Sequence, residues 1–287
     1  MYFIVESGST KSDWVLIESK NKKNIYSTIG FNPYFHSSIQ IENEIRKNVA
    51  LTEIAPQIKG IYFYGAGCSS ENLNLIVSNG LKSVFTNAQI TVEHDLLACA
   101  YATYTGKPVI SCILGTGSNS CFFDGENLKE EVPALGYILG DEGSGSYFGK
   151  QLISNFLYQR LPAEIAQDFT LTYQLGKNEL IDRIYKQPNA NVFIASFMPF
   201  IAKYKDNDFI KTMVRDGFKK FMEIHVCCFE NFKEVEVNFV GSISEIFEKQ
   251  LHEAASAYEI SIGRIIRRPV DALVQYHLDY VLNFELN

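Results

Sequence analysis

The sequence predicts an α/β protein of two domains, each built on a mixed β-sheet. Two observations carry this prediction. A strand–turn–strand unit occurs twice, about a hundred residues apart, and the first copy is followed by strands that alternate with helices before the pattern restarts. The first copy reads YFIV, ESGSTKS and DWVLIE, and the second reads ISCIL, GTGSNS and CFFDG. With 287 residues, the chain is long enough for two domains of ordinary size.

The first domain is expected to span residues 1–108. Its elements, in order, are the strand pair of the first unit, a strand at NIYSTIGF, a helix around residues 38–51, the strand KGIYFYGAG, a helix, the strand AQITV and the helical run LLACAYATY. An antiparallel start followed by alternating strands and helices implies a mixed sheet. The turn signal Thr105-Gly106-Lys107-Pro108 marks the boundary.

The second domain is expected to span residues 109–287 and to carry a helical insertion. A long helix follows Gly145, a helical region covers about 160 to 230, and the strand VEVNFV leads through Gly241-Ser242 into another helix. The final helix, about residues 271–285, is predicted to dock on the first domain. The face that favours this docking carries Leu273, Val274, His277, Leu278 and Val281.

Composition makes several classes of partner unexpected. The formal net charge of −7 argues against a general nucleic-acid binder and against binding to an anionic membrane. No apolar run reaches the roughly 18 residues of a membrane span, and Met1 leads directly into a strand, so we expect a cytoplasmic protein. Six cysteines without CxxC spacing indicate neither a zinc site nor a disulfide framework.

The two turns favour binding of a polyphosphate. A triphosphate needs converging backbone N–H groups and hydroxyls with no side chain in the way, and glycine permits that close approach. The residues expected at the phosphates are Gly8, Ser9, Thr10, Lys11, Gly115, Thr116 and Gly117, and the hydroxyls of Ser7, Ser12 and Ser118 add to the donors. The alternative is two ordinary β-hairpins, since Gly and Ser are common turn residues. Neither turn matches a P-loop or a dinucleotide fingerprint.

In this layout the chain resembles the actin, Hsp70 and sugar-kinase superfamily, and within it the BadF/BadG-type ATPases and N-acetylglucosamine kinases. The matching stretches are ESGSTKSDW, TIGFNPYF, YFYGAGC, EHDLLA, ILGTGSNSCFFDG, GYILGDEGSG and FVGSISEIF. The resemblance implies two ribonuclease H-like, actin-like ATPase domains, with nucleotide and sugar in the cleft between them. It also implies ATP and Mg²⁺ as cofactors, and it is compatible with a homodimer.

The resemblance also assigns roles to single residues. Asp95, which local sequence alone would explain as an acid at a helix start, is implied to be the general base that takes a proton from the sugar hydroxyl. The residues implied to contact the sugar are Asn32, Ser118, Asn119 and Asp141, and the alternative for Asp141 is a cap of the next helix. Gly241 and Ser242 resemble the adenosine motif, although Gly-Ser after a strand is also an ordinary connection.

Glu6 departs from the family pattern. Relatives carry Asp there, which helps to orient the hydrated Mg²⁺, and Glu adds one methylene group. A shift of the order of 1 Å can cost about a hundredfold in rate. The site therefore either adjusts through water, with Glu6 serving Mg²⁺, or loses activity.

The resemblance leaves three functions open. The first is an ATP-dependent kinase that phosphorylates N-acetylglucosamine or a related amino sugar at its 6-hydroxyl. The second is an ATPase activator of a dehydratase, which needs cluster-ligating cysteines and has Cys68 as its only candidate beside a Gly-rich loop. The third is a sensor of sugar or nucleotide that has lost turnover through Glu6.

Overall fold

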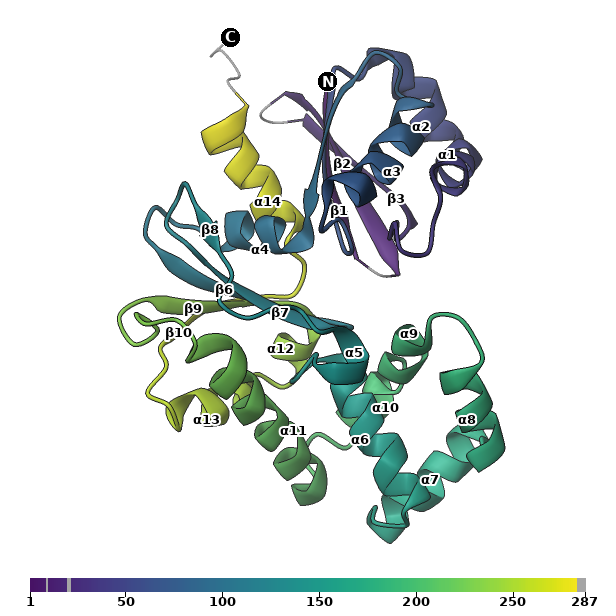
Figure 1. Ribbon diagram of the computed structural model, residues 1–287, viewed down its shortest axis with the longest axis vertical. Helices are drawn as coiled ribbons and strands as arrows, with labels where there is room; N and C mark the ends of the chain where they lie inside the picture. The colour runs from purple at the N-terminus through teal and green to yellow at the C-terminus, as the bar shows by residue number, and fades with distance from the viewer. Residues whose placement is uncertain (9, 20–21, 283–287) are drawn as a thin grey trace. The chain divides into compact units, whose positions relative to one another are not determined.

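The computed structural model describes residues 1–8, 10–19 and 22–282. Contacts divide the chain into two compact units. Unit 1 is Met1–Tyr104 together with the segment from Pro269 onward, and unit 2 is Thr105–Arg268. The division thus falls at residue 104, against the expected boundary at residue 108, and the C-terminal helix belongs to unit 1 (Figure 1).

Unit 1 contains a five-stranded mixed sheet in the order β3-β2-β1-β4-β5. Its strands are β1 (Tyr2–Ser7), β2 (Lys11–Ser19), β3 (Lys22–Ile29), β4 (Gly60–Gly65) and β5 (Gln89–His94). The strands β1, β2 and β3 pair antiparallel, whereas β4 and β5 run parallel to β1. Because β1 and β2 are covered on both faces, they read as nearly continuous apolar runs.

Helices cover both faces of this sheet. They are α1 (Ser38–Lys47), α2 (Val49–Ile54), the 3₁₀ turn η1 (Ala55–Gln57), α3 (Glu71–Lys82), α4 (Asp95–Thr103), α14 (Val270–Tyr276) and the π-helical turn η3 (His277–Val281). On one face Phe3 and Trp14 pack with residues of α1 and α3. On the other face Ile4 and Val15 pack with Ala98 of α4 and with α14.

The C-terminal helix differs from its prediction. The helix is regular only to Tyr276, and the Leu282 N–H then donates to His277 O, five residues back. A π turn holds one residue more than an α turn and shifts the following side chains around the axis. As a result Leu282 is buried and Val281, expected on the docking face, is 38% exposed. Residues 283–285 of the predicted helix lie outside the described residues.

Unit 2 repeats the sheet pattern of unit 1, in the order β10-β9-β6-β7-β8. Its strands are β6 (Val109–Leu114), β7 (Ser118–Phe123), β8 (Leu128–Lys129), β9 (Glu236–Val240) and β10 (Ile262–Ile266). Here β6, β7 and β8 pair antiparallel, and β9 and β10 run parallel to β6. The repeated strand–turn–strand unit is therefore the start of a repeated mixed sheet, and the predicted α/β fold class is confirmed.

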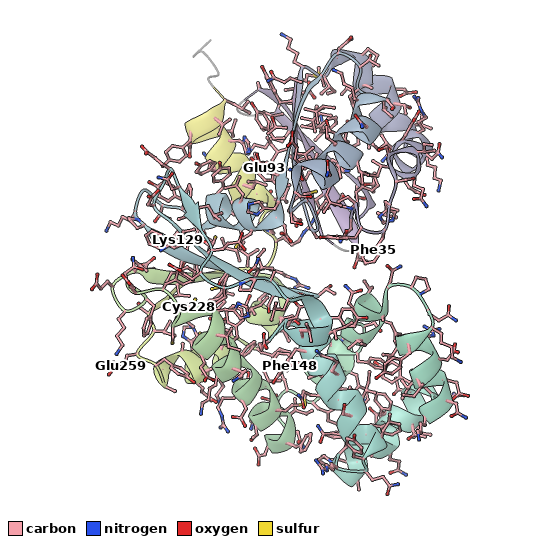
Figure 2. The ribbon with its side chains drawn as sticks, viewed as in Figure 1. Phe35, Glu93, Lys129, Phe148, Cys228 and Glu259 are labelled. Carbon is pink, nitrogen blue, oxygen red and sulfur yellow. The ribbon has the colours of Figure 1, made fainter. Side chains whose placement is uncertain are left out.

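The helices of unit 2 form one large core with β6. They are α5 (Gly136–Leu139), α6 (Gly145–Leu157), α7 (Ala163–Tyr173), α8 (Lys177–Tyr185), α9 (Ala190–Ala195), α10 (Met198–Lys203), α11 (Asp208–Phe221), the π-helical turn η2 (Met222–Val226), α12 (Ser242–Ile246) and α13 (Glu248–Ser256). Phe148 of α6 is fully buried in this core (Figure 2). Within the described part of the chain, every helix is too short or too polar to cross a bilayer.

Candidate functional site

In unit 1 the predicted phosphate residues lie in the turn between β1 and β2. The Gly8 N–H donates to Lys11 O at 3.0 Å, and Lys11 forms an ion pair of 2.7 Å with Asp13. Thr10 is exposed, and Ser9 lies outside the described residues. Atoms nearest to a Cβ built on Gly8 are 3.8 Å away, so the backbone there is open to an approaching group.

Two hydroxyls of this turn serve the fold and are not available to a ligand. Ser7 and Ser12 are fully buried. Ser12 Oγ lies 2.7 Å from Ser7 Oγ and 3.0 Å from Ile29 O, and Ser7 Oγ accepts the Phe31 N–H at 2.9 Å. The expectation that both serines donate to a phosphate is wrong, because these bonds tie the turn to the segment that leads into Asn32.

The turn glycines matter for the space around the backbone and not for its conformation. Positive φ angles are found at several glycines, but not at Gly8, Gly115 or Gly117. These three glycines are therefore not needed for backbone conformation. A Cβ on Gly8 or Gly115 would make only ordinary contacts, the nearest at 3.8 Å and 3.9 Å, whereas Gly117 makes room for the carboxylate of Asp141.

A row of polar side chains crosses the sheet of unit 1. Glu6 on β1 pairs with Asp13 on β2 and with Tyr64 on β4, and Tyr64 pairs with Glu93 on β5. Partners in register project to the same face of a sheet. The row therefore lies on the face covered by α4 and α14, because Tyr64 belongs to that apolar cluster. Sequence analysis found only Glu6, since the others become neighbours through strand register.

Asp95 directly follows this row. It is the first residue of α4, immediately after β5. The side chain of His94, whose Nδ1 accepts the Leu97 N–H at 3.3 Å, caps the helix. Asp95 is thus a first-turn acid at the carboxyl end of a parallel strand. That end is where ligands bind in open α/β sheets.

Asn32 lies against the loop that follows β4. Its Oδ1 accepts the Tyr34 N–H at 3.0 Å, and its backbone O accepts the N–H of His36 at 2.9 Å. Gly67 has a φ of +83°, and a Cβ there would lie 2.5 Å from Asn32 Oδ1. Only glycine fits both the positive φ and the close contact with Asn32. In the same loop, burial together with the carboxylates of Asp95 and Glu93 raises the pKa of the Cys68 thiol to about 12.

In unit 2 the second turn is held by the start of α6. The Gly115 N–H donates to Gly117 O at 3.0 Å, the Gly145 N–H donates to Gly115 O at 2.8 Å, and the Ser146 N–H donates to Thr116 O at 3.0 Å. Two of the first amides of the helix are therefore engaged with the turn. The Thr116 hydroxyl has no hydrogen-bond partner among the described residues.

Asp141 lies on this turn. Its Oδ1 accepts the Ser118 N–H at 3.3 Å, and its Oδ2 accepts the Ser146 hydroxyl at 3.4 Å. A Cβ on Gly117 would lie 3.0 Å from Oδ2. Burial raises the pKa of Asp141, opposed by the Ser118 amide. Ser144, whose hydroxyl accepts the Tyr147 N–H at 3.1 Å, caps α6, so the capping interpretation of Asp141 is wrong.

Ser118 and Asn119 project to opposite faces of the sheet, as successive strand residues do. The Ser118 hydroxyl is buried and donates to Glu142 O at 2.7 Å, so its proton is already used within the protein. The Asn119 side chain accepts the Ser120 N–H at 2.8 Å and donates to Glu130 at 3.4 Å. Asn119 is partly exposed. Of the two, Asn119 has the side chain that a ligand can reach.

Gly241, directly after β9, lies against the second turn. Its φ is +130°, and a Cβ there would lie 2.1 Å from Leu114 O. This contact places Gly241 and Ser242, the first residue of α12, beside the Gly115–Gly117 turn at the carboxyl end of two parallel strands. The turn predicted to bind phosphates and the motif predicted to bind adenosine thus meet at one edge of the sheet of unit 2.

Known proteins share this fold. No protein-family model and no curated protein matches the sequence. The fold is similar to that of a Porphyromonas gingivalis protein named "Putative N-acetylglucosamine Kinase", with 33% identity, a TM-score of 0.92, and coverage of 98% of this chain and 100% of that one. The chain belongs to the sugar kinases of the actin-like ATPase superfamily.

Two more distant structures share the fold of this sugar kinase. A Chromobacterium violaceum protein, also named as a "Putative N-acetylglucosamine Kinase", matches with 14% identity and a TM-score of 0.70, over 96% of this chain and 98% of that one. A ROK-family glucokinase from Streptomyces griseus, in complex with glucose and AMPPNP, matches with 14% identity and a TM-score of 0.54, over 96% and 97% of the two chains.

A part-buried pair of a histidine and a carboxylate beside Asp141 was not predicted from the sequence. Glu142 Oε2 lies 3.3 Å from Nε2 of His225, which is 4% exposed. Burial lowers the pKa of His225, and the bond to Glu142 opposes that shift. Lys150 donates to Tyr137 O, and its pKa is lowered by burial. The only sequence signal was the Asp-Glu pair in GDEGSG, since the partner histidine lies 83 residues further on.

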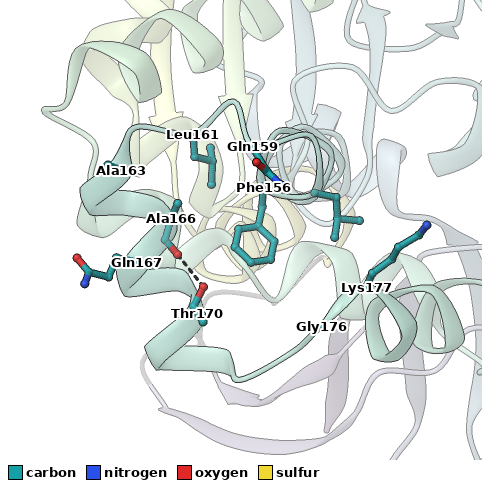
Figure 3. A pocket seen from close by; sticks show the side chains of 10 residues that line it. Phe156, Gln159, Leu161, Ala163, Ala166, Gln167, Thr170, Gly176 and Lys177 are labelled. Atoms are coloured by element: carbon teal, nitrogen blue, oxygen red, sulfur yellow. Dashed lines mark hydrogen bonds between the residues drawn. The ribbon is translucent and has the colours of Figure 1, made fainter.

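A separate groove of about 620 Å³ lies in the helical insertion of the kinase (Figure 3). Its walls are Phe156, Leu157, Gln159, Leu161, Ala163, Ala166, Gln167, Thr170, Gly176 and Lys177. Phe156 lies eleven residues along α6 from Gly145, which is roughly 16 Å at 1.5 Å per residue. The groove is therefore distinct from the second turn.

Proposed function

We propose that the chain is an ATP-dependent kinase that phosphorylates N-acetylglucosamine or a related amino sugar at its 6-hydroxyl. The observation that carries this proposal is the full-length similarity, at 33% identity and a TM-score of 0.92, to the Porphyromonas gingivalis protein of that name. Each turn follows the carboxyl end of a strand, β1 or β6, and Asp95 follows β5 of the first sheet. These residues supply the chemistry of the proposal.

In unit 1 the proposed general base is Asp95. Asp95 would take the proton of the sugar hydroxyl while that oxygen bonds to the γ-phosphorus of ATP and the bond from phosphorus to the β–γ bridging oxygen breaks. The products are the sugar phosphate and ADP. Asn32, oriented by its turn and by Gly67, would bind sugar hydroxyls, because an amide can both donate and accept.

The residues present fit ATP phosphates and a water-held Mg²⁺. Without side chains at Gly8 and Gly115, phosphate oxygens could approach the backbone, and Lys11 would add a positive charge. Mg²⁺ would neutralise charge that develops on the phosphoryl group. No cluster of three or more His, Cys, Asp or Glu residues within the described ranges could hold a metal. Glu6 would therefore act through water, as is usual for Mg²⁺ at phosphates.

In unit 2 we assign different residues to the phosphates, to the sugar and to the adenosine. Thr116 would donate its unpaired hydroxyl to the phosphates, while Asn119 and Asp141 would bind the sugar. Gly241 and Ser242 would lie along the adenosine. The Ser118 hydroxyl holds the Glu142 backbone, so we assign Ser118 to shaping the site.

The activator function is less well supported by the environment of its cysteine. Cys68 is 1% exposed, and burial raises its pKa to about 12, whereas a cluster ligand at a subunit interface must be an accessible thiolate. A homodimer remains part of the proposal, and sedimentation equilibrium of the purified chain tests it.

The test is a coupled assay of ATP consumption with N-acetylglucosamine, N-acetylmuramic acid, glucosamine and glucose. We expect turnover with at least one N-acetylated or amino sugar and little without sugar. ATP hydrolysis that no sugar stimulates would instead favour the activator function. Sugar or nucleotide binding without turnover would favour the sensor.

A further inference from the structure

The segment that presents Asp141 has a backbone that needs external support. Asp141 has a φ of +58°, and Gly143, two residues on, has a φ of +72°. A non-glycine residue in this region is strained and persists only where the surrounding structure holds it. Asp141 itself is held weakly, because its carboxylate contacts to Ser118 and Ser146 are 3.3 and 3.4 Å long.

The support comes through Glu142. Its backbone O accepts the Ser118 hydroxyl at 2.7 Å, and its carboxylate lies 3.3 Å from His225 Nε2. Gly143 packs against Phe221, on which the His225 ring also stacks with a centroid distance of 4.9 Å. Glu142 is therefore fixed at both its main chain and its side chain, directly after the strained residue.

The position of His225 is itself specified by unusual structure. It lies in the π-helical turn η2 that ends α11, and such turns are rare and frequent at functional sites. Its backbone O accepts the Ser120 hydroxyl at 2.6 Å, next to the second turn. His225 Nδ1 is buried and has no partner within the described chain, so the bond to Glu142 is the only hydrogen bond of the ring.

The carboxylate partner fixes the tautomer of His225. A carboxylate accepts, so Nε2 carries the proton, and burial keeps the ring neutral by lowering its pKa. The charged groups that face the ring are Glu142 and Asp141. A neutral histidine with this donor can hold the Glu142 carboxylate in place, and it does not exchange protons with a substrate.

We propose that His225 is a positioning residue that holds Asp141 in its sugar-binding orientation by hydrogen-bonding Glu142. The proposal rests on the proposed function for its consequence on sugar binding, but the positioning itself can be measured without activity. Removing the bond lets the segment from Asp141 to Gly143 relax, which weakens the contact between Asp141 and the Ser118 amide.

The experiment compares three single variants, and the double variant His225→Leu/Glu142→Ala, with the wild type. His225→Leu removes the donor, Glu142→Ala removes the acceptor, and His225→Gln keeps an N–H donor in reach of Glu142. His252→Leu, at an exposed histidine of α13, is the matched control. The readouts are hydrogen exchange at the Ser118 amide, the KM for sugar and the KM for ATP.

We expect His225→Leu and Glu142→Ala each to speed Ser118 exchange and to raise the sugar KM by about tenfold, the scale of losing one buried hydrogen bond. The ATP KM should change less than twofold. The double variant should be no worse than either single one, because both changes break the same bond. His225→Gln should restore wild-type values within about threefold.

Unchanged Ser118 exchange in both His225→Leu and Glu142→Ala would overturn the proposal, whatever the activity. A lower melting temperature with unchanged exchange and sugar KM would show a merely structural role. If the wild type phosphorylates no sugar, the proposed function fails while the exchange data still decide on the positioning. If His225→Leu does not fold, Glu142→Ala gives the decision.

Discussion

Among single residues, Asp95 has the most direct chemical consequence. Its Cα is fixed at the end of β5 and the start of α4, and His94 rather than Asp95 caps the helix. We predict that Asp95→Asn lowers kcat by about two to four orders of magnitude, because the amide cannot accept the hydroxyl proton. Sugar affinity should stay close to that of the wild type.

Steady-state kinetics and calorimetry of sugar binding measure both quantities for Asp95→Asn. Asp206→Asn, at an exposed aspartate of unit 2, serves as the control for loss of one charge. Turnover near the wild-type rate in Asp95→Asn would remove Asp95 from the mechanism.

Glu6 is the residue whose type departs from the family pattern. It is the central carboxylate of the row between Asp13 and Tyr64, which sits beside the first turn. If Glu6 orients hydrated Mg²⁺, Glu6→Asp should keep or raise kcat. Glu6→Gln should lower kcat and weaken the dependence on Mg²⁺, because a negative charge near a divalent cation is lost.

Mg²⁺ titrations of ATP turnover for the wild type and both variants provide the measurement. An unchanged Mg²⁺ dependence in Glu6→Gln would mean that Glu6 is only a strand residue and that other groups hold the metal.

At the level of elements, a buried histidine directly follows α14 and contacts β4. His277 is fully buried, its Nε2 lies 2.9 Å from the Tyr64 hydroxyl, and burial lowers its pKa from 6.5 to about 4. A histidine that is harder to protonate when folded stabilises the fold above its unfolded pKa. That stability is lost as the pH falls from about 6.5 to about 4. The shift corresponds to about 3 kcal/mol.

Urea unfolding at several pH values between 7 and 4 tests this dependence. We predict that His277→Gln is less stable than the wild type at pH 7 but loses less stability on acidification, by up to about 3 kcal/mol. His252→Gln should follow the wild-type curve. Parallel curves for His277→Gln and the wild type would contradict the assignment.

The contact between β9 and the second turn gives a second prediction at this scale. Gly241 and Gly106 both have positive φ, at +130° and +89°, but a Cβ on Gly241 would lie 2.1 Å from Leu114 O, whereas a Cβ on Gly106 meets nothing within 4 Å. Gly106→Ala should therefore cost about 1 kcal/mol through backbone strain alone. Gly241→Ala should cost about 3 kcal/mol or more, because backbone must also move.

Thermal or urea unfolding of the two alanine variants gives the comparison. Equal losses of stability would show that the close approach of Gly241 to β6 carries no energetic weight.

At the scale of the whole molecule, the duplicated architecture could be predicted because its signals are local. Glycine, serine and threonine mark each turn, and apolar runs mark the strands on either side. The position of Asp95 was predictable for the same reason, since it falls where a strand gives way to a helical run. The division into sheets of matching order follows from these repeated units.

Other features depend on contacts between distant parts of the chain. Ser7, Ser12 and Ser118 look like free hydroxyls in sequence, yet register and packing bury them. The row that includes Asp13 and Glu93 exists only through strand pairing. The bond between Glu142 and His225 spans 83 residues, and the π turn at His277 has no evident local sequence signal.

The central claim is that this fold transfers phosphate from ATP to a sugar hydroxyl with Asp95 as the base. The most direct measurement is ³¹P and ¹³C nuclear magnetic resonance of the products after incubation of the protein with ATP, Mg²⁺ and N-acetylglucosamine, beside Asp95→Asn. We predict ADP and a sugar 6-phosphate in equal amounts from the wild type and almost none from the variant. Inorganic phosphate without sugar phosphate, or equal sugar phosphate from both proteins, would contradict the account.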